Sequence, residues 1–245
     1  MNQKISPQDP TLNIAAPVGF DARAVPIQEV CDAQLKVADH ALEPLSLRRR
    51  FQNPQVWQPE ITDESRHVIA SDIISKRQAA GKVTRAAVLI PLLLKSDGLS
   101  VLLTQRTDHL HDHAGQISFP GGRMDPGDSS PNDTALRESE EEIGLDREGV
   151  EIIGHLPQYL TVSGYSVTPV VGLVQPQAEY VLDAFEVADV FEVPLHFLMN
   201  PANHQVRVWE SDQGSRRFYS MPYENRFIWG ATAGMLRNLY HLLKV

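Results

Sequence analysis

The chain has 245 residues, of which 42% are apolar, and a formal net charge of −9. This composition excludes wholesale disorder. The negative charge argues against a general nucleic-acid binder, which usually presents a basic surface, but it does not exclude an anionic substrate, because a bound divalent cation can reverse the local field.

Residues 1–83 predict a partly helical extension without a targeting or membrane segment. The N-terminus lacks the apolar run of a signal peptide, and the longest apolar stretch, residues 86–94, is too short to span a bilayer. Residues 1–25 are polar, so we expect little order there. Apolar spacing predicts helices over 26–42 and 64–80. We expect the residues 48–50, three arginines, to form a solvated face or ion pairs; a phosphate or partner contact is the alternative.

The one cysteine, Cys31, cannot form an internal disulfide. A reducing, cytoplasmic setting is the simplest interpretation. Cys31 lies among Ile27, Val30 and Leu35 at helical spacing. We therefore expect a buried or half-buried thiol rather than a nucleophile.

From residue 84 to 245 the sequence predicts one α+β domain with a mixed sheet. Strands over 85–94 and 99–106 form a hairpin around the turn at 96–98. A loop over 107–116, a short strand over 117–119 and a break at 120–122 precede a helix over 132–143, which Gly144 ends. Strands follow over 150–160 and 167–174, a helix over 186–199 interrupted at Pro194, strands over 204–210 and 215–221, and a final helix over 229–243. Strands and helices do not alternate regularly, which favours the α+β class.

The chemistry is concentrated in the helix that ends at Gly144. Glu138, Glu141 and Glu142 stand at i, i+3 and i+4, so they share one face and repel one another when ionised. Arg137 could offset that repulsion, but a hard divalent cation such as Mg²⁺, which prefers oxygen ligands, would do so better. A solvated acidic face is the alternative. The glycines before the helix favour a ligand site, because they let the backbone approach a ligand closely.

The stretch from Gly122 to Leu145 resembles the Nudix box, Gly-x5-Glu-x7-Arg-Glu-U-x-Glu-Glu-x-Gly-U, where U is a bulky apolar residue. The matching positions are Gly122, Arg137, Glu138, Glu141, Glu142, Gly144 and Leu145. Asp128 stands where the box has its first glutamate, with Asp125 as a competitor, and the loop to Arg137 is one residue longer. Ser139 replaces the apolar U.

The resemblance implies a mixed sheet between helices and an enzyme that hydrolyses a phosphoanhydride bond with Mg²⁺ or Mn²⁺. Glu138, Glu141 and Glu142 would be metal ligands, with the Gly122 carbonyl as a further one, and Arg137 would pair with a carboxylate to shape the loop. One glutamate would act as general base. Two later residues, Glu186 and Glu192, lie where many Nudix proteins bring a further acid toward the site; a helix-capping role is the alternative.

The segment before the box, residues 102–122, is similar to the signature of the coenzyme A pyrophosphatase subgroup. Its matches are Leu102, Leu103, Thr104, Arg106, Gly115, Phe119, Pro120, Gly121 and Gly122. Thr107 replaces a serine or alanine. His111 replaces an arginine, so a permanently charged phosphate donor becomes one charged only near or below its pKa.

This second resemblance implies hydrolysis of coenzyme A or acyl-CoA to 3′,5′-ADP and 4′-phosphopantetheine. The implied substrate-binding residues are Arg106, His111, Gly115, Phe119, Gly121, Gly122 and Arg123. A groove for the pantetheine arm would use Phe119, Tyr159, Tyr165 and Val167, for which core packing is the alternative. The partner is a small nucleotide, with no nucleic acid or membrane, and a homodimer is left open.

Three alternatives remain open from the sequence. Another nucleoside diphosphate derivative, such as an ADP-sugar or a dinucleotide, is favoured by the change at His111. A catalytically silent ligand-binding module and a nucleic-acid binder that uses residues 48–50 come from other classes. The alternating histidines His109, His111 and His113 could bind zinc, but no cysteine accompanies them, so we expect ordinary loop histidines near a phosphate site.

Overall fold

The computed structural model describes residues 20–59, 83–109, 115–161, 164–211 and 214–244. The strands are β1 (Ile27–Val30), β2 (Thr84–Lys95), β3 (Gly98–Arg106), β4 (Ile117–Ser118), β5 (Gly121–Arg123), β6 (Val150–His155), β7 (Tyr159–Leu160), β8 (Tyr165–Val174), β9 (Val187–Pro194), β10 (Gln205–Ser211), β11 (Gly214–Tyr223) and β12 (Arg226–Trp229). The α-helices are α1 (Pro44–Gln52), α3 (Pro131–Ile143), α4 (Leu195–Leu198) and α5 (Gly230–Leu243). Short 3-10 helices are η1 (Cys31–Ala33), η2 (Asp39–Leu42), η3 (Arg147–Gly149) and η4 (Pro201–Asn203).

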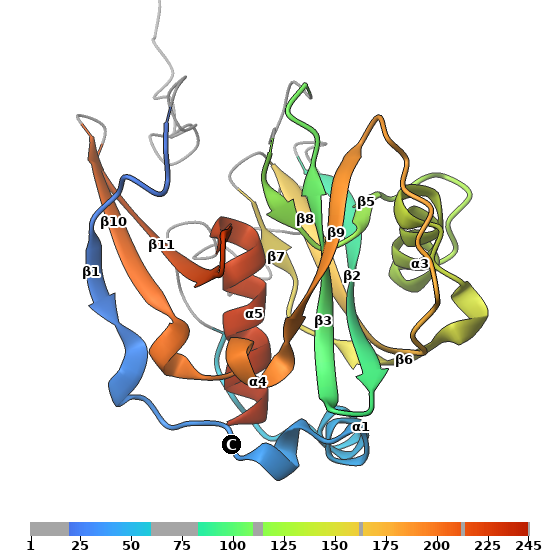
Figure 1. Ribbon diagram of the computed structural model, residues 1–245, viewed down its shortest axis with the longest axis horizontal. Helices are drawn as coiled ribbons and strands as arrows, with labels where there is room; N and C mark the ends of the chain where they lie inside the picture. The colour runs from blue at the N-terminus through green and yellow to red at the C-terminus, as the bar shows by residue number, and fades with distance from the viewer. Residues whose placement is uncertain (1–19, 60–82, 110–114, 162–163, 212–213, 245) are drawn as a thin grey trace, which may run out of the picture.

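A mixed sheet with β2 at its centre lies between α3 and α5 (Figure 1). β2 runs parallel to β8 and antiparallel to β3 and β5. Successive side chains of a strand point to opposite faces, and β2 is buried on both. Leu89 and Leu93 pack with Ile143 of α3, whereas Ile90 and Leu92 belong to the core that contains α5. The predicted α+β fold with a mixed sheet between helices is confirmed.

A second, antiparallel sheet in the order β1-β10-β11-β12 lies beside α5 (Figure 1). The described part of the predicted N-terminal extension supplies its edge strand, because Ile27 to Val30 pair with Gln205 to Arg207 of β10. α1 packs next to β6, where Leu47 is fully buried. The described part of the extension thus contributes an edge strand and some buried side chains, such as that of Leu47, to the domain.

The central strand β2 changes its antiparallel partner halfway along its length. Its second half, from Leu92 to Lys95, pairs with β3, whereas residues 86–88 pair with β5. Between them, the Leu89 N–H donates to the Pro120 carbonyl at 2.9 Å. β3 separates from β2 here and pairs with β4 at Thr104 and Gln105. The glycine turn of residues 120–122 therefore enters the sheet directly beside α3, and this switch positions the candidate site.

Most predicted elements are confirmed, including the hairpin, the short strand at Ile117, the acidic helix, and the last helix. The helix predicted over 26–42 is wrong: this segment contains β1 and two 3-10 helices. Its apolar residues do not form one buried face, because Ile27, Val30 and Leu35 are exposed while Cys31 is buried. The Cys31 thiol is thus buried as expected, but it lies in a 3-10 helix rather than in the predicted α-helix.

The helix predicted over 186–199 is also wrong for most of its length. Residues 187–194 form β9, which pairs along the outer edge of β3, and only Leu195–Leu198 after Pro194 is helical. Its β-branched valines suit a pleated, half-buried strand. The short strands β5 and β12 were not predicted, and the strand predicted over 150–160 is divided into β6 and β7.

Two predictions for the extension lie outside the described residues, the helix over 64–80 and the low order of residues 1–19. For residues 20–25 the expectation of little order is wrong, because Ala22 and Val25 are buried in a cluster with Phe218. Of the three arginines, Arg48 forms an ion pair with Glu151 at 2.6 Å, which confirms the ion-pair interpretation for this residue. Among the described residues, no helix is both long and apolar enough to cross a membrane.

Candidate active site

The acidic helix α3 has a defined start and end. The Ser130 side chain accepts a hydrogen bond from the Asp133 N–H at 3.2 Å, and Pro131 occupies the first turn, where a missing N–H costs nothing. The helix ends at Gly144, whose φ of 63° is left-handed and favours glycine. Ser139, at the apolar position of the box, is buried, and its hydroxyl donates to the Ala135 carbonyl at 2.6 Å. A polar residue is tolerated there because its hydrogen bond is made within the helix.

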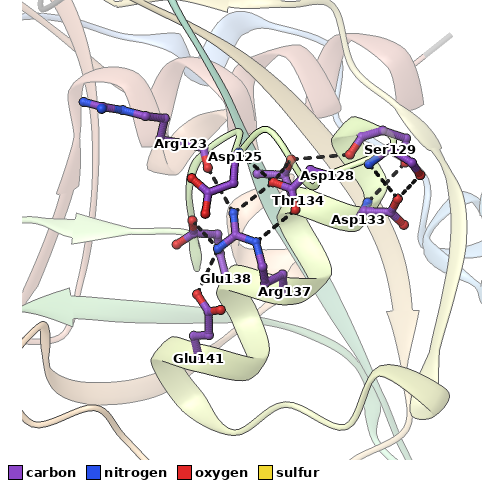
Figure 2. Close-up of polar contacts among 10 residues, drawn as sticks. Arg123, Asp125, Asp128, Ser129, Asp133, Thr134, Arg137, Glu138 and Glu141 are labelled. Carbon is purple, nitrogen blue, oxygen red and sulfur yellow. Dashed lines mark hydrogen bonds and ion pairs between the residues drawn. The ribbon is translucent and has the colours of Figure 1, made fainter.

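Arg137 connects the helix with the loop that precedes it (Figure 2). Its Nε and Nη2 atoms donate to both carboxylate oxygens of Asp128, at 3.0 and 2.9 Å. Nη1 lies 2.9 Å from a carboxylate oxygen of Glu138 and 2.9 Å from one of Glu141. Nη2 also donates to the Arg123 carbonyl at 3.1 Å. The planar fork of arginine suits such bidentate contacts, so this side chain holds the loop against the helix.

Asp128, rather than Asp125, is the acid that faces Arg137. Its side chain is 6% exposed, and it also accepts hydrogen bonds from the Asp125 N–H and the Thr134 hydroxyl, both at 2.9 Å. The Arg137 guanidinium and these donors hold the pKa of Asp128 well below its usual range. The acid at the first box position therefore stays ionised and shapes the loop in this structure.

Glu142 is the most buried acid of the cluster, with 6% of its surface exposed. Its Oε2 accepts a hydrogen bond from the Gly121 N–H at 3.2 Å. The pKa of Glu142 is raised to about 8, mainly by burial and also by the negative charges of Glu138 and Glu186, while the Gly121 N–H and Arg106 oppose the rise. Burial also raises the pKa of Glu138, against the effect of its neighbouring arginine.

The two glycines before the helix give this cluster its space. Gly121, with φ of 150°, lies against the β2 backbone, and a Cβ there would collide with the Ala87 carbonyl and Val88. A Cβ on Gly122 would collide with the carboxylate of Glu138. The backbone therefore approaches both the sheet and the Glu138 carboxylate closely, which glycine allows because it has no Cβ.

Two charged residues from other elements lie near these acids. Glu186, in the turn before β9, is close enough to raise the pKa of both Glu138 and Glu142. The Arg106 Nε atom at the end of β3 is buried and has no hydrogen-bond partner among the described residues. A buried N–H without a partner is suited to donate to an anionic ligand. A cation bound by the acids would attract such a ligand to this place. Glu192 instead pairs with Lys95 at 2.6 Å, and neither Glu186 nor Glu192 caps a helix.

The donor chemistry of the cluster fits a hard divalent cation. The carboxylates of half-buried Glu138 and buried Glu142 repel each other and Glu186, and an ion between them would relieve that repulsion. Within the described ranges, no three acidic, histidine or cysteine side chains converge tightly enough to enclose an ion. Mg²⁺ usually takes one or two protein carboxylates and completes its shell with water and substrate phosphates, and Glu138 and Glu142 are the two residues that could supply them. Glu141 is 58% exposed and held by Arg137, so of the three box glutamates it lies furthest toward solvent.

The remaining predicted substrate residues occupy different environments. Gly115 follows the loop with a φ of 67°, and Arg123 points away from the acids toward solvent (Figure 2). Phe119 is 2% exposed and packs in the core, so its visible role is to anchor the glycine turn. His111 and His113 lie outside the described residues.

The predicted pantetheine groove is not an open surface. Tyr159 and Val167 are buried in the same core as Phe119, and only Tyr165 is partly exposed. Tyr159 packs against Gly234 of α5, where a Cβ would lie 2.8 Å from the tyrosine ring. Core packing, the alternative given for these residues, describes all but Tyr165.

Comparisons with known proteins agree with this geometry. Residues 83–212 match the family described as the NUDIX domain. The chain is 44% identical over 155 residues to the uncharacterized Nudix hydrolase NudL of Yersinia pestis (strain Pestoides F), a match that covers 63% of this chain and 77% of that protein. Among solved structures, it is similar to the Nudix hydrolase RenU of M. smegmatis, at 23% identity and a TM-score of 0.40, over 46% of this chain and 71% of that one. It is also similar to an Ap4A hydrolase of C. elegans, at 22% identity and a TM-score of 0.41, over 49% and 86% of the two chains.

Proposed function

The chain belongs to the Nudix family, and from that premise we propose that this Nudix hydrolase cleaves the pyrophosphate of coenzyme A or acyl-CoA with Mg²⁺ or Mn²⁺ bound. The products would be 3′,5′-ADP and 4′-phosphopantetheine. The observation that carries the hydrolytic part is the cluster of buried Glu142 and half-buried Glu138 beside two close-packed glycines.

Some residues of the site shape the loop before α3, and others would bind the cation. Arg137 and Asp128 fix the loop, so that the Gly122 backbone and the Glu138 carboxylate meet at one place. Glu138 and Glu142, with Gly122 as a backbone candidate, would hold the cation. When bound, the cation supplies charge neutralisation on the phosphate oxygens and lowers the pKa of coordinated water.

Arg106 is the described residue best suited to bind the substrate phosphates. Its buried Nε has an unused N–H, and its charge already acts on Glu142. A phosphate oxygen that accepted this N–H would be held next to the acids, so water could attack phosphorus as the phosphoanhydride P–O bond breaks. A carboxylate of the cluster must accept the proton of that water, and Glu138, Glu142 and Glu186 are the described candidates.

The choice of coenzyme A depends on the signature over residues 102–122. Two of its residues support the proposal, since Gly121 donates a hydrogen bond to Glu142 and the charge of Arg106 acts on the same carboxylate. The test is to incubate the protein with coenzyme A, acetyl-CoA and ADP-ribose, each with Mg²⁺ or Mn²⁺, and to identify the products by mass spectrometry. Release of 3′,5′-ADP and 4′-phosphopantetheine from coenzyme A supports the proposal. Cleavage of ADP-ribose without cleavage of coenzyme A would reject coenzyme A as the substrate, while the proposal of a Nudix hydrolase would stand.

The second candidate substrate is an ADP-sugar or a dinucleotide, and the change at His111 favours it. If His111 contacts a phosphate of coenzyme A, the KM should rise as pH climbs through the imidazole pKa, unperturbed at about 6.5. His111→Arg should then lower KM and flatten the pH dependence. Equal KM values for both proteins from pH 5.5 to 8.5 would show that position 111 does not select the substrate.

A further inference from the structure

An exposed aromatic side chain lies on the turn that carries Glu186. Phe185 is 65% exposed, although burial of a phenylalanine side chain is favourable. Its ring lies 5.0 Å from the His109 ring, centroid to centroid, at a tilt of 60°. His109 belongs to the loop of the 102–122 signature and is also exposed. Two aromatic rings from separate loops thus meet at the surface.

Hydrogen bonds fix Phe185 to the elements that build the acidic site. The Phe185 carbonyl accepts from the Thr107 hydroxyl at 2.8 Å, and the Glu186 carbonyl accepts from the Thr107 N–H at 3.0 Å. On the other side, the Asp183 N–H donates to the Glu142 carbonyl at 2.9 Å, in the last turn of α3. The turn is thus attached to both β3 and α3, and the ring position is set by the same residues that set the site.

Phe185 and Glu186 are consecutive residues of one helical turn. The Asp183 carbonyl accepts from the N–H groups of both Glu186 and Val187, at 3.0 and 2.8 Å. In such a helical turn, successive side chains fan apart by roughly 100° instead of alternating as in a strand. Phe185 therefore precedes Glu186 on a turn that is attached by hydrogen bonds to Thr107 on one side and to the Glu142 backbone on the other.

An exposed aromatic ring solves a problem that the charges of this site create. A chain with a net charge of −9 and a cluster of carboxylates repels the phosphates of its substrate. A flat apolar contact with an uncharged part of the substrate adds affinity that does not depend on the electrostatic field of the protein. The uncharged flat group that every adenosine diphosphate derivative carries is its purine base, and stacking of a base on an aromatic ring contributes roughly 1–3 kcal/mol.

We propose that Phe185, backed by His109, is the residue on which the purine base of the substrate stacks. This inference rests on the proposed hydrolysis of a nucleoside diphosphate derivative, but not on coenzyme A as the substrate. Phe185 thereby becomes a specificity-determining residue that favours purine nucleotides. Val181, which is 73% exposed on the same connection, offers a matched control, because it has similar exposure and no aromatic face.

Binding of the products tests the stacking without any turnover. The Phe185→Trp and Val181→Trp proteins are titrated with AMP and with ribose 5-phosphate, and the tryptophan fluorescence is compared with that of the parent. Quenching of Phe185→Trp by AMP, with no quenching by ribose 5-phosphate and none in Val181→Trp, is the expected result. Equal responses to both probes, or none in Phe185→Trp, would overturn the proposal even if the protein proves to be an active hydrolase.

Kinetics on ADP-ribose or coenzyme A, whichever is cleaved, give the second measurement. Phe185→Ala should raise KM about tenfold, the low end of the stacking range, with kcat within about twofold of the parent. Phe185→Tyr should restore KM, and Val181→Ala should leave it unchanged. An unchanged KM in Phe185→Ala overturns the proposal. A raised KM in Phe185→Ala that is accompanied by a change of molecular mass in light scattering also overturns it, since the ring would then belong to a contact between copies of the chain. Failure to cleave either substrate rejects the proposed function, and the AMP titration still decides the stacking.

Discussion

Glu142→Gln should stabilise the metal-free protein at alkaline pH while removing its activity. The pKa of Glu142 rises from its usual 4.5 to about 8 because the side chain is buried. A shift of this size corresponds to a free energy on the order of 5 kcal/mol. Because the folded state has the higher pKa, it binds the proton more tightly than the unfolded state. The contribution to stability is fully present below pH 4.5 and is lost as pH rises through about 8. Glutamine is neutral throughout and keeps the acceptor for the Gly121 N–H.

The measurement is urea unfolding of both proteins in a chelator, from pH 5 to pH 8.5. The free energies of unfolding should be similar at pH 5, and at pH 8.5 the variant should be more stable by roughly 2–4 kcal/mol. Glu140→Gln is the control, because Glu140 lies on the same helix but is exposed. Added Mg²⁺ should raise the free energy of unfolding of the parent at pH 8.5, because the cation binds the ionised carboxylate. It should leave that of Glu142→Gln unchanged. A difference between the two proteins that does not change with pH would refute the reasoning.

Three further outcomes are expected. Hydrolysis should stop in excess EDTA and return with Mg²⁺ or Mn²⁺; full activity in the chelator would contradict a cation held by the cluster. Gly122→Ala should lower kcat at least tenfold because its Cβ collides with Glu138, whereas Gly127→Ala, with no atom within 4 Å of its Cβ, should be silent in the same assay. Asp128→Asn should lower the free energy of unfolding by roughly 2–4 kcal/mol, because it leaves Arg137 without its ionised partner. The parent should lose this contribution as pH falls below the usual range of aspartate, a trend that the variant should lack in acid unfolding curves.

The sequence could predict the acidic helix because its determinants are local. The cap at Ser130, the glycine at Gly144 and the i, i+3, i+4 spacing of the glutamates all lie within fifteen residues. The burial of Glu142 could not be predicted in the same way. It depends on the partner switch of β2, which brings the Gly121 N–H to the carboxylate, and this involves residues far apart in the chain.

The two wrong helices have a common physical cause. β1 and β9 both pair with the edge of a strand distant in sequence, at β10 and β3 respectively. Short apolar segments read from sequence alone do not distinguish a helix from an edge strand, because tertiary pairing overrides local preference. Because a helix was predicted here, a helix-capping role was considered for Glu186. In the structure Glu186 lies instead in a turn before β9.

The departure of the box at Asp128 is compensated by the structure. Aspartate is one methylene shorter than glutamate, and the loop from Asp128 to Arg137 is one residue longer than the pattern. The loop brings the shorter acid within bidentate reach of Arg137. The arginine then neutralises Asp128 and Glu141, while Glu142 accepts only the Gly121 N–H among its described hydrogen bonds. The acids therefore fall into two groups, those whose charge is used to hold the loop and those whose charge is left for a cation. Glu138 belongs to both, because it contacts the arginine and lies against the glycine backbone.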